Sequence, residues 1–166
     1  MDEKYVKHTA HELSTWAKLK GDNILELHGL AIFRNCLTMI SPWMELGSVN
    51  RAIGINPDLD RYRLCKQLAA AIKHLHEVEN VIHGDIKGDN VLMASDGTLK
   101  LTDFGLAIMH DKTLQFSQTD PGRGTTRWMA PELYDGAQRC RESDIYAMGM
   151  VSMRARNSMI GKDQLI

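Results

Sequence analysis

One short segment, VIHGDIKGDNVL at residues 81–92, constrains this chain more than any other part of its sequence. Two apolar pairs stand at its ends, Val81-Ile82 and Val91-Leu92, and mostly polar residues stand between them. Glycine and aspartate at this density disfavour both a strand interior and a helix. The segment therefore predicts a polar loop that core residues hold at both ends.

The loop offers Asp85, Lys87 and Asn90, which suit the handling of a phosphate group and a metal ion. An aspartate can accept or orient the proton of a hydroxyl nucleophile, and a lysine brings a point charge to phosphate oxygens. Carboxylate and amide oxygens suit Mg²⁺. A second carboxylate, Asp103, follows the next short apolar run, and Gly105 behind it permits an unusual backbone. An ordinary Asp-Gly-rich turn is the alternative, and it is favoured for the Asp103 segment taken alone.

Length, charge and cysteine content exclude several classes of protein. The 166 residues suggest one domain, and a formal net charge of −1 gives no basic footprint for nucleic acid. No apolar run approaches the length of a transmembrane helix, so we expect no membrane span. Cys36, Cys65 and Cys140 are few and widely spaced, which is typical of reduced thiols. We therefore expect a protein of the cytoplasm or the nucleus.

Periodic apolar residues predict the first elements. Residues 8–20 carry a helical stripe, and Gly21 stands at the C′ position that favours glycine. The stripe consists of Leu13, Trp16, Ala17 and Leu19. Two short apolar runs, 24–33 and 37–41, predict an antiparallel pair of strands.

The remaining pattern is mainly helical. Residues 59–78 predict an amphipathic helix with Asp58 as its N-cap. A short strand is expected at 99–101, and a long polar loop at 106–129. Residues 143–153 are apolar almost all round, which predicts a buried helix. Helices combined with short antiparallel strands indicate an α+β fold.

Four motifs in one order resemble those of the eukaryotic protein kinase family. The loop HGDIKGDN is similar to the catalytic loop H-R-D-x-K-x-x-N, with Gly84 where the family usually has Arg. Asp103-Phe104-Gly105 matches the metal-binding DFG, and Ala130-Pro131-Glu132 matches the APE that closes the activation segment. Ser143-Asp144 followed by IYAMGMV resembles the start of the central buried helix. The order and spacing agree over about residues 8–151.

The resemblance implies a partial bilobal kinase fold, with helix C and two small-lobe strands above a truncated, mainly helical large lobe. Residues 1–46 would be the remnant of the small lobe and the hinge, 47–151 the large-lobe portion, and 152–166 a divergent tail. The family's G-x-G-x-x-G loop and strand lysine do not precede Glu12 at the expected spacing. We therefore expect an incomplete kinase domain, whether a truncated gene model, a splice product or a remnant.

The same resemblance assigns the chemistry residue by residue. Asp85 is the expected catalytic base, and Lys87 would neutralise the transferred phosphoryl group. Asn90 and Asp103 would hold Mg²⁺. Glu12 lies at the helix-C glutamate position, and this glutamate normally pairs with a lysine of the third strand.

ATP would bind at the hinge. Pro42 would offer its carbonyl to the adenine amino group, since proline has no N–H, and Met44 would supply an N–H donor. Leu92 would pack beneath the adenine, and Ser41 would be the gatekeeper.

Structural roles follow from the resemblance as well. Four side chains would form a stacked column that links the lobes: Trp16, Leu27, His83 and Phe104. Asp144 would accept hydrogen bonds from backbone N–H groups of the catalytic loop, because so many turn amides need partners. The Thr125 hydroxyl would position that loop, and Glu132 would pair with an arginine that this sequence lacks.

The implied activity is ATP- and Mg²⁺-dependent phosphoryl transfer to Ser or Thr hydroxyls of a protein substrate. Lys87 and Gly124-Thr125 resemble Ser/Thr kinases, and Trp128 resembles their tyrosine-kinase-like branch. We expect this activity to be impaired in residues 1–166 alone. A catalytically inert kinase-like module that binds partners is the alternative. The sequence leaves the oligomeric state open.

Overall fold

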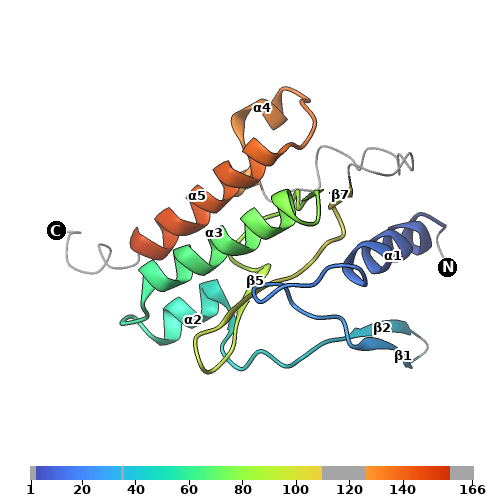
Figure 1. The fold of residues 1–166 in the computed structure, drawn as a ribbon, viewed down its shortest axis with the longest axis horizontal. Coiled ribbons are helices and arrows are strands. Elements are labelled where there is room, and N and C mark those ends of the chain that lie inside the picture. The colour runs from blue at the N-terminus through green and yellow to red at the C-terminus, as the bar shows by residue number, and fades with distance from the viewer. Residues whose placement is uncertain (1–2, 35, 110–125, 158–166) are drawn as a thin grey trace.

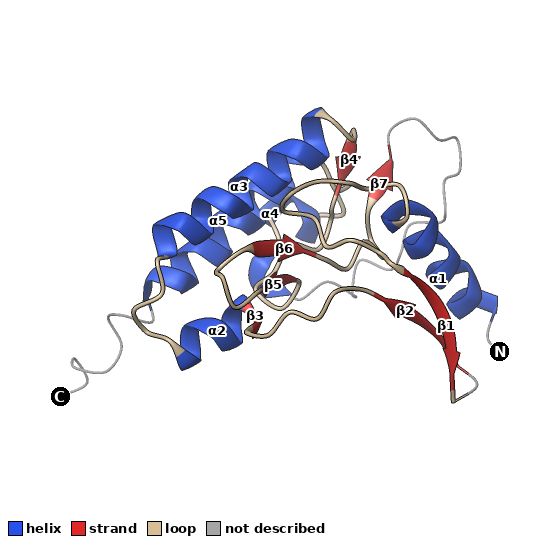
Figure 2. Cartoon of the chain, turned by 60° about the horizontal axis from the view of Figure 1, so that its bottom comes forward, coloured by secondary structure: helices blue, strands red, loops and turns tan. Residues whose placement is uncertain are grey.

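The computed structural model describes residues 3–34, 36–109 and 126–157 (Figure 1). The helices are α1 Glu3–Trp16, α2 Val49–Ile55, α3 Arg61–Glu77, α4 Pro131–Tyr134 and α5 Arg141–Asn157, with a 3₁₀ turn at Thr126–Trp128. The strands are β1 Gly29–Phe33, β2 Cys36–Ile40, β3 Gly47–Ser48, β4 Val81–Ile82, β5 Val91–Met93, β6 Leu99–Leu101 and β7 Ile108–Met109. Within these residues the strands pair antiparallel as β1–β2, β3–β5–β6 and β4–β7. Runs of helices and runs of short antiparallel strands follow one another along the chain (Figure 2), which confirms the α+β class.

Helices α3 and α5 lie side by side (Figure 1), as their apolar patterns predict. One face of α3 is buried, and it carries Leu64, Leu68, Ala71, Ile72 and Leu75. The helix is shorter than the predicted 59–78, and its N-cap is Asp60 rather than Asp58. Asp60 Oδ1 accepts a hydrogen bond from the Arg63 N–H at 2.9 Å, because a cap side chain reaches the amide three residues ahead.

Helix α5 is longer than the predicted 143–153 and is buried on one face only. Asp144, Ala147 and Val151 are buried at a spacing that puts them on one side of the helix. Ile145 and Met153 are 49% and 58% exposed. The predicted burial of this helix is therefore confirmed for one face, and the described residues leave apolar side chains exposed on the rest of it.

The β3–β5–β6 sheet fixes the ends of two functional segments. β5 begins directly after Asn90 and pairs with β6, with Val91 opposite Leu101. Val91 and Leu101 are fully buried. Since successive side chains of a strand point to opposite faces, every second side chain of β5 and β6 anchors its strand in the core. This register brings the chain at residue 90 beside the chain at residue 102.

The predicted antiparallel pair of strands is confirmed, with β1 and β2 shorter than the runs 24–33 and 37–41. Residues 23–25 run along β6 instead. The Leu25 N–H donates to the Leu101 carbonyl at 2.9 Å, and the Leu101 N–H donates to the Asn23 carbonyl at 2.8 Å. These bonds attach the segment between α1 and β1 to the sheet that carries the loop.

Helix α1 ends at Trp16, earlier than the predicted residue 20. The N–H groups of Lys18 and Leu19 turn back to carbonyls three residues earlier, and this tighter pattern closes the helix. Gly21 is therefore not the C′ residue. A Cβ atom at Gly21 would lie 3.0 Å from the ring of His74, so a side chain there would require that ring to shift by a few tenths of an ångström.

None of the helices in the described part of the chain combines the length and the hydropathy that a membrane span requires.

Candidate active site

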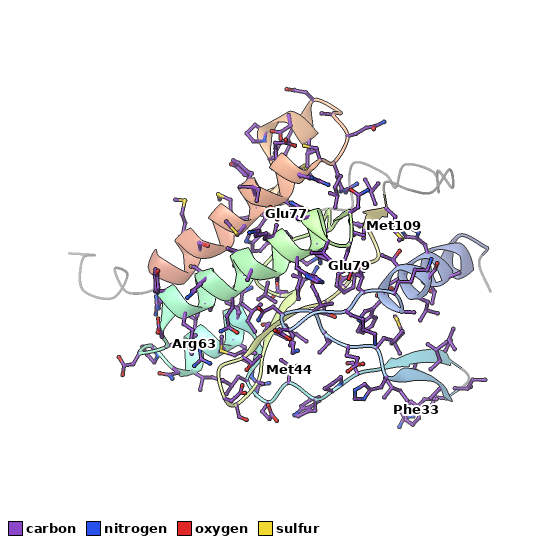
Figure 3. The ribbon with its side chains drawn as sticks, in the orientation of Figure 1. Phe33, Met44, Arg63, Glu77, Glu79 and Met109 are labelled. Carbon is purple, nitrogen blue, oxygen red and sulfur yellow. The ribbon has the colours of Figure 1, made fainter. Side chains whose placement is uncertain are left out.

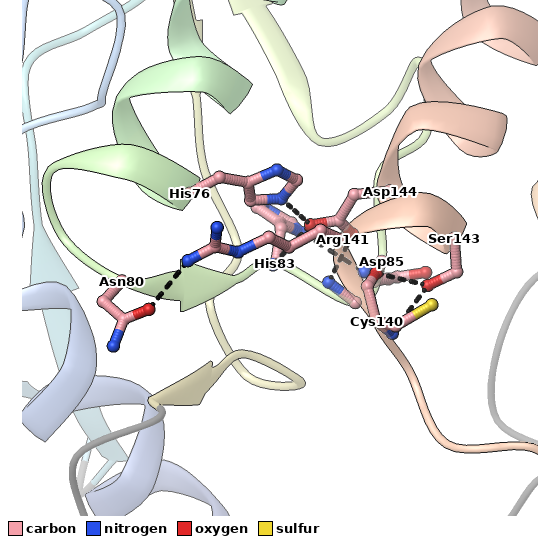
Figure 4. Close-up of polar contacts among 9 residues, drawn as sticks. His76, Asn80, His83, Asp85, Cys140, Arg141, Ser143 and Asp144 are labelled. Atoms are coloured by element: carbon pink, nitrogen blue, oxygen red, sulfur yellow. Dashed lines mark hydrogen bonds and ion pairs between the residues drawn. The ribbon is translucent and has the colours of Figure 1, made fainter.

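The loop at residues 83–90 joins β4 to β5, and a buried carboxylate of α5 holds its first residues (Figure 4). Asp144 Oδ2 accepts a hydrogen bond from the His83 N–H at 2.8 Å, and Oδ1 accepts one from the Gly84 N–H at 2.9 Å. His76 of α3 lies 2.8 Å from the same Oδ2 atom. The predicted role of Asp144 as the acceptor for loop amides is therefore confirmed.

Both ring nitrogens of His83 have backbone partners. Nδ1 accepts from the Asp85 N–H at 3.2 Å, and Nε2 lies 3.1 Å from the Thr102 carbonyl. This pattern requires the proton on Nε2, since one ring nitrogen accepts and the other donates. His83 is completely buried. Its role is to hold the loop, rather than to shuttle protons.

Asp85, Lys87 and Asn90 meet at one carboxylate oxygen. Lys87 Nζ donates to Asp85 Oδ2 at 2.5 Å, and Asn90 Nδ2 donates to the same oxygen at 3.1 Å. Asn90 Nδ2 also donates to the Asp85 backbone carbonyl at 2.9 Å. The three predicted side chains therefore form one cluster. Lys87 and Asn90 both donate to Oδ2 of Asp85, and neither donates to its Oδ1 atom.

The β5–β6 register brings the chain just before Asp103 to the end of the loop. The Thr102 N–H donates to the Asn90 carbonyl at 3.0 Å, which places the residue before Asp103 against the end of the loop. Asp103 has a φ of 66°, a left-handed value that is uncommon and costly for a residue other than glycine. The special backbone that the sequence suggested for Gly105 is thus found at Asp103. Such strain is often concentrated at functional sites.

Comparison with known protein families matches residues 1–161 to the protein kinase domain. The chain belongs to the protein kinase family. Its α+β arrangement is that of a partial kinase fold. The HGDIKGDN, DFG and APE motifs all lie within the matched residues.

Among related kinases, mouse mitogen-activated protein kinase kinase kinase 4 is 32% identical, covering 90% of this chain and 10% of the relative. A probable serine/threonine-protein kinase of Dictyostelium discoideum is 30% identical, covering 96% of this chain and 18% of its own length. A receptor protein-tyrosine kinase of Arabidopsis thaliana is 33% identical, and the match covers 84% of this chain and 15% of the relative. The kinase chain thus spans well under a quarter of each of these three relatives.

The kinase residues offer a donor set that fits Mg²⁺. Asn90 is buried and uses its amide nitrogen toward Asp85, so its Oδ1 atom is the side-chain atom left for a cation. Asp103 supplies a carboxylate from the neighbouring strand end. Mg²⁺ is usually held by one or two carboxylates together with substrate phosphates, so Asn90 and Asp103 are the residues that would hold it.

Glu12 of α1 faces Asp103 across the site. Burial raises the pKa of the Glu12 carboxyl, and the negative charge of Asp103 raises it further. His11 beside it contacts the Ala107 carbonyl at 2.8 Å, which ties α1 to the segment after Phe104. The structure therefore places Glu12, the residue at the predicted helix-C glutamate position, on α1 near the carboxylate of Asp103.

Three members of the predicted column, Trp16, His83 and Phe104, meet at the ring of Phe104, which is completely buried. Its ring centroid lies 6.3 Å from that of Trp16 and 5.2 Å from that of His83. Leu27 is partly buried and packs against the same core. The column connects α1 to the catalytic loop through one aromatic ring of the DFG segment. Gly105, the last residue of that segment, is buried.

The residues predicted to bind adenine lie in the segment between β2 and β3 and in β5. Met44 is buried in this segment (Figure 3), and its carbonyl accepts from the Gly47 N–H at 3.0 Å. The Leu46 N–H donates to the Met93 carbonyl at 3.1 Å, which holds the segment against β5. Leu92 is only partly buried between two buried neighbours, so it faces the opposite side of the sheet. Pro42 precedes Met44 in this segment, as expected for a hinge.

Two further predicted residues have different outcomes. Thr125 lies outside the described residues. Glu132 is exposed in the first turn of α4.

Sequence reasoning missed three residues that contact the loop. His76 had no predicted role at the loop, but it is buried and lies 2.8 Å from Asp144 Oδ2. Asn50 donates to Asp89 Oδ1 at 2.8 Å, and a Cβ atom at Gly88 would lie 2.4 Å from Asn50 Oδ1. Arg139 reaches Gly84 from the segment before α5. The one available signal was glycine itself, because Gly84 and Gly88 mark where another side chain comes close.

Proposed function

We propose that the domain to which this chain belongs transfers the γ-phosphoryl group of ATP to Ser or Thr hydroxyls of proteins. One observation supports this most directly: Lys87 and Asn90 both donate to Asp85 Oδ2. The carboxylate is thereby fixed in orientation, and Oδ1 is left for a substrate hydroxyl.

In this proposal, the acceptor hydroxyl oxygen bonds to the γ-phosphorus as the bond from that phosphorus to the β–γ bridging oxygen breaks. The hydroxyl proton passes to Asp85 Oδ1, and ADP is the leaving group. Lys87 brings positive charge to the transferred group. Mg²⁺, when bound, supplies neutralisation of the phosphate oxygens. Asn90 and Asp103 would hold it.

The preference for Ser and Thr over Tyr is part of the proposal. It is supported by Lys87 in the loop and by the printed name of the Dictyostelium relative, a serine/threonine-protein kinase. The name of the Arabidopsis relative, a receptor protein-tyrosine kinase, points the other way. Peptides with Ser, Thr or Tyr as the single acceptor distinguish the two.

The environment of Glu12 favours a second candidate function for residues 1–166 alone, an inert module that binds partners. Glu12 faces Asp103, and burial together with the negative charge of Asp103 raises the pKa of the Glu12 carboxyl. Positioning and charge stabilisation make up most of the catalysis of phosphoryl transfer. Loss of one preorganised donor typically costs about 10²–10³ in rate. We propose that residues 1–166 bind Mg·ATP weakly and turn over too slowly to measure.

The experiment measures transfer of labelled phosphate from ATP to peptides. It compares residues 1–166 with a longer chain that adds a Gly-rich loop and strand lysine before them and large-lobe helices after them. We expect turnover from the longer chain only, and its loss by about 10²-fold or more in Asp85→Asn. Asp96→Asn, at an exposed turn between β5 and β6, is the matched control with unchanged turnover. A longer chain that binds ATP without transferring phosphate would favour the inert module.

A further inference from the structure

Gly84 stands directly before Asp85, and no side chain can be placed on it. Its φ is +78°, a left-handed value that favours glycine. A Cβ atom there would lie 2.7 Å from Arg139 Cδ and 2.8 Å from the Leu106 carbonyl oxygen. The space beside this residue is therefore already filled by an arginine from 55 positions later in the chain.

Arg139 does more than fill space, because it bonds to the loop. Its Nε donates to the Gly84 carbonyl at 2.9 Å, in a partly buried setting. The Gly84 N–H donates to Asp144 Oδ1 at 2.9 Å. A cationic side chain and an anionic one thus hold the two polar backbone groups of the same glycine. Both come from the C-terminal part of the described chain, within or just before α5.

Such a clamp has a specific physical effect at this position. Glycine has the widest choice of backbone conformations, and fixing it costs more entropy than fixing any other residue. A free glycine before Asp85 would let the carboxylate of Asp85 move relative to Asn90 and Asp103. Hydrogen bonds to charged groups are stronger than those between neutral groups, so two of them fix the peptide planes on both sides of Gly84.

We infer that Arg139 is a positioning residue for Asp85, acting through the Gly84 carbonyl. This role rests on the proposed function in so far as Asp85 is the catalytic base. Arg139 and Asp85 also line the same hollow, together with Trp128 and Met129. The arginine that the kinase pattern carries next to the catalytic aspartate is absent from the loop, and Arg139 brings a guanidinium to that place from another segment.

The test is hydrogen–deuterium exchange of residues 82–92 in the full chain, with α3 as the internal reference. Arg139→Met keeps an unbranched stem and removes the Nε donor. We expect it to speed exchange in the loop about tenfold, the factor expected for one hydrogen bond to a charged group, without changing α3. Arg139→Lys restores a charged donor and should recover part of the protection.

Arg141→Met is the matched control. Arg141 lies two residues away and donates to Asn80 Oδ1 at 2.8 Å, away from Gly84 (Figure 4). It should leave exchange in the loop unchanged. The inference is overturned if Arg139→Met leaves the loop protected, if α3 accelerates by the same factor, or if Arg139→Lys exchanges as fast as Arg139→Met.

A second measurement separates positioning from general stability. In a longer chain with turnover, Arg139→Met should lower kcat about tenfold and leave the KM for ATP unchanged, because the adenine site lies elsewhere. An unchanged kcat would contradict the inference. The exchange experiment contains no nucleotide. Failure of the parent chain to transfer phosphate would thus overturn the proposed function and leave the exchange result to decide the role of Arg139.

Discussion

Asp144 Oδ1 accepts a hydrogen bond at 2.9 Å from the N–H of Gly84, sixty residues earlier in the chain. The other oxygen of this buried carboxylate accepts from His83 and lies 2.8 Å from His76 Nε2. One side chain of α5 therefore organises the start of the catalytic loop and its contact with α3.

Replacing Asp144 by Asn should destabilise the chain strongly. Asparagine has one oxygen where the carboxylate has two, so its NH₂ group would face a loop amide and leave a buried donor unsatisfied. We expect a loss of about 2–4 kcal/mol in the free energy of unfolding. Urea denaturation measures it, and Asp135→Asn on the exposed end of α4 should change stability by less than about 0.5 kcal/mol. Equal effects of the two substitutions would contradict this account.

Gly84 and Gly136 form a matched pair for testing close packing. Both have positive φ, 78° and 84°, but a Cβ atom at Gly136 would meet no atom within 4 Å. Gly136→Ala should therefore cost only the backbone strain, about 1 kcal/mol. Gly84→Ala should cost that strain and also displace Arg139 or the Leu106 carbonyl. Thermal unfolding should show a clearly larger loss for Gly84→Ala, and similar losses would show that the contact is not tight.

Glu12 should make the folded state less stable as the pH rises. Its folded-state pKa is raised, so the folded chain holds a proton that the unfolded chain has released in the window above the ordinary value of 4.5. Stability then falls as pH rises through this window, and the loss is complete above the folded-state pKa. Glu12→Gln should remove this part of the pH dependence and raise Tm at pH 7.

Glu26 provides the control of opposite sign. Its pKa is lowered by the hydrogen bond and charge of Lys20. Glu26→Gln should therefore give no rise in Tm at pH 7. A Glu12→Gln chain with the pH profile of the parent chain would show that Asp103 and burial do not act on Glu12 as described.

Exposed apolar side chains on α5 predict self-association of residues 1–166. Ile145 and Met153 lie on the side of α5 that the described residues leave open. Contiguous exposed apolar surface marks binding or aggregation, and we expect these two side chains to contribute to such a surface. Sedimentation velocity should show association that Ile145→Glu reduces. Ile55→Glu, at an exposed isoleucine on α2, should not reduce it, and a monodisperse parent chain would refute the prediction.

The sequence predicted the parts of the site that depend on neighbouring residues. The loop between two apolar pairs, the short strand before Asp103 and the face of α3 all follow from local periodicity. The cluster of Asp85, Lys87 and Asn90 was predicted because the three lie within six residues of one another. The kinase resemblance added Glu12 and Asp144, which local spacing alone could not relate to the loop.

Contacts that depend on exact three-dimensional approach were not predictable. The N-cap at Asp60 rather than Asp58 depends on which aspartate reaches a free amide. The apolar pattern of α5 shows that the helix can be buried, but which of its faces is covered depends on the elements that pack against it. Arg139 and His74 were missed because each fills the space beside a glycine far away in sequence, and a glycine can mark a close approach without showing which residue makes it.

The two glycine contacts have an evolutionary consequence. Gly84 lies under Arg139, and Gly21 lies under the ring of His74. At Gly84 the family pattern has an arginine where this chain has glycine. A lineage that gains a side chain at Gly84 or Gly21 must also displace the distant residue that now occupies that space. The order of substitutions is therefore constrained, and Gly84 with Arg139, like Gly21 with His74, should be inherited and lost together.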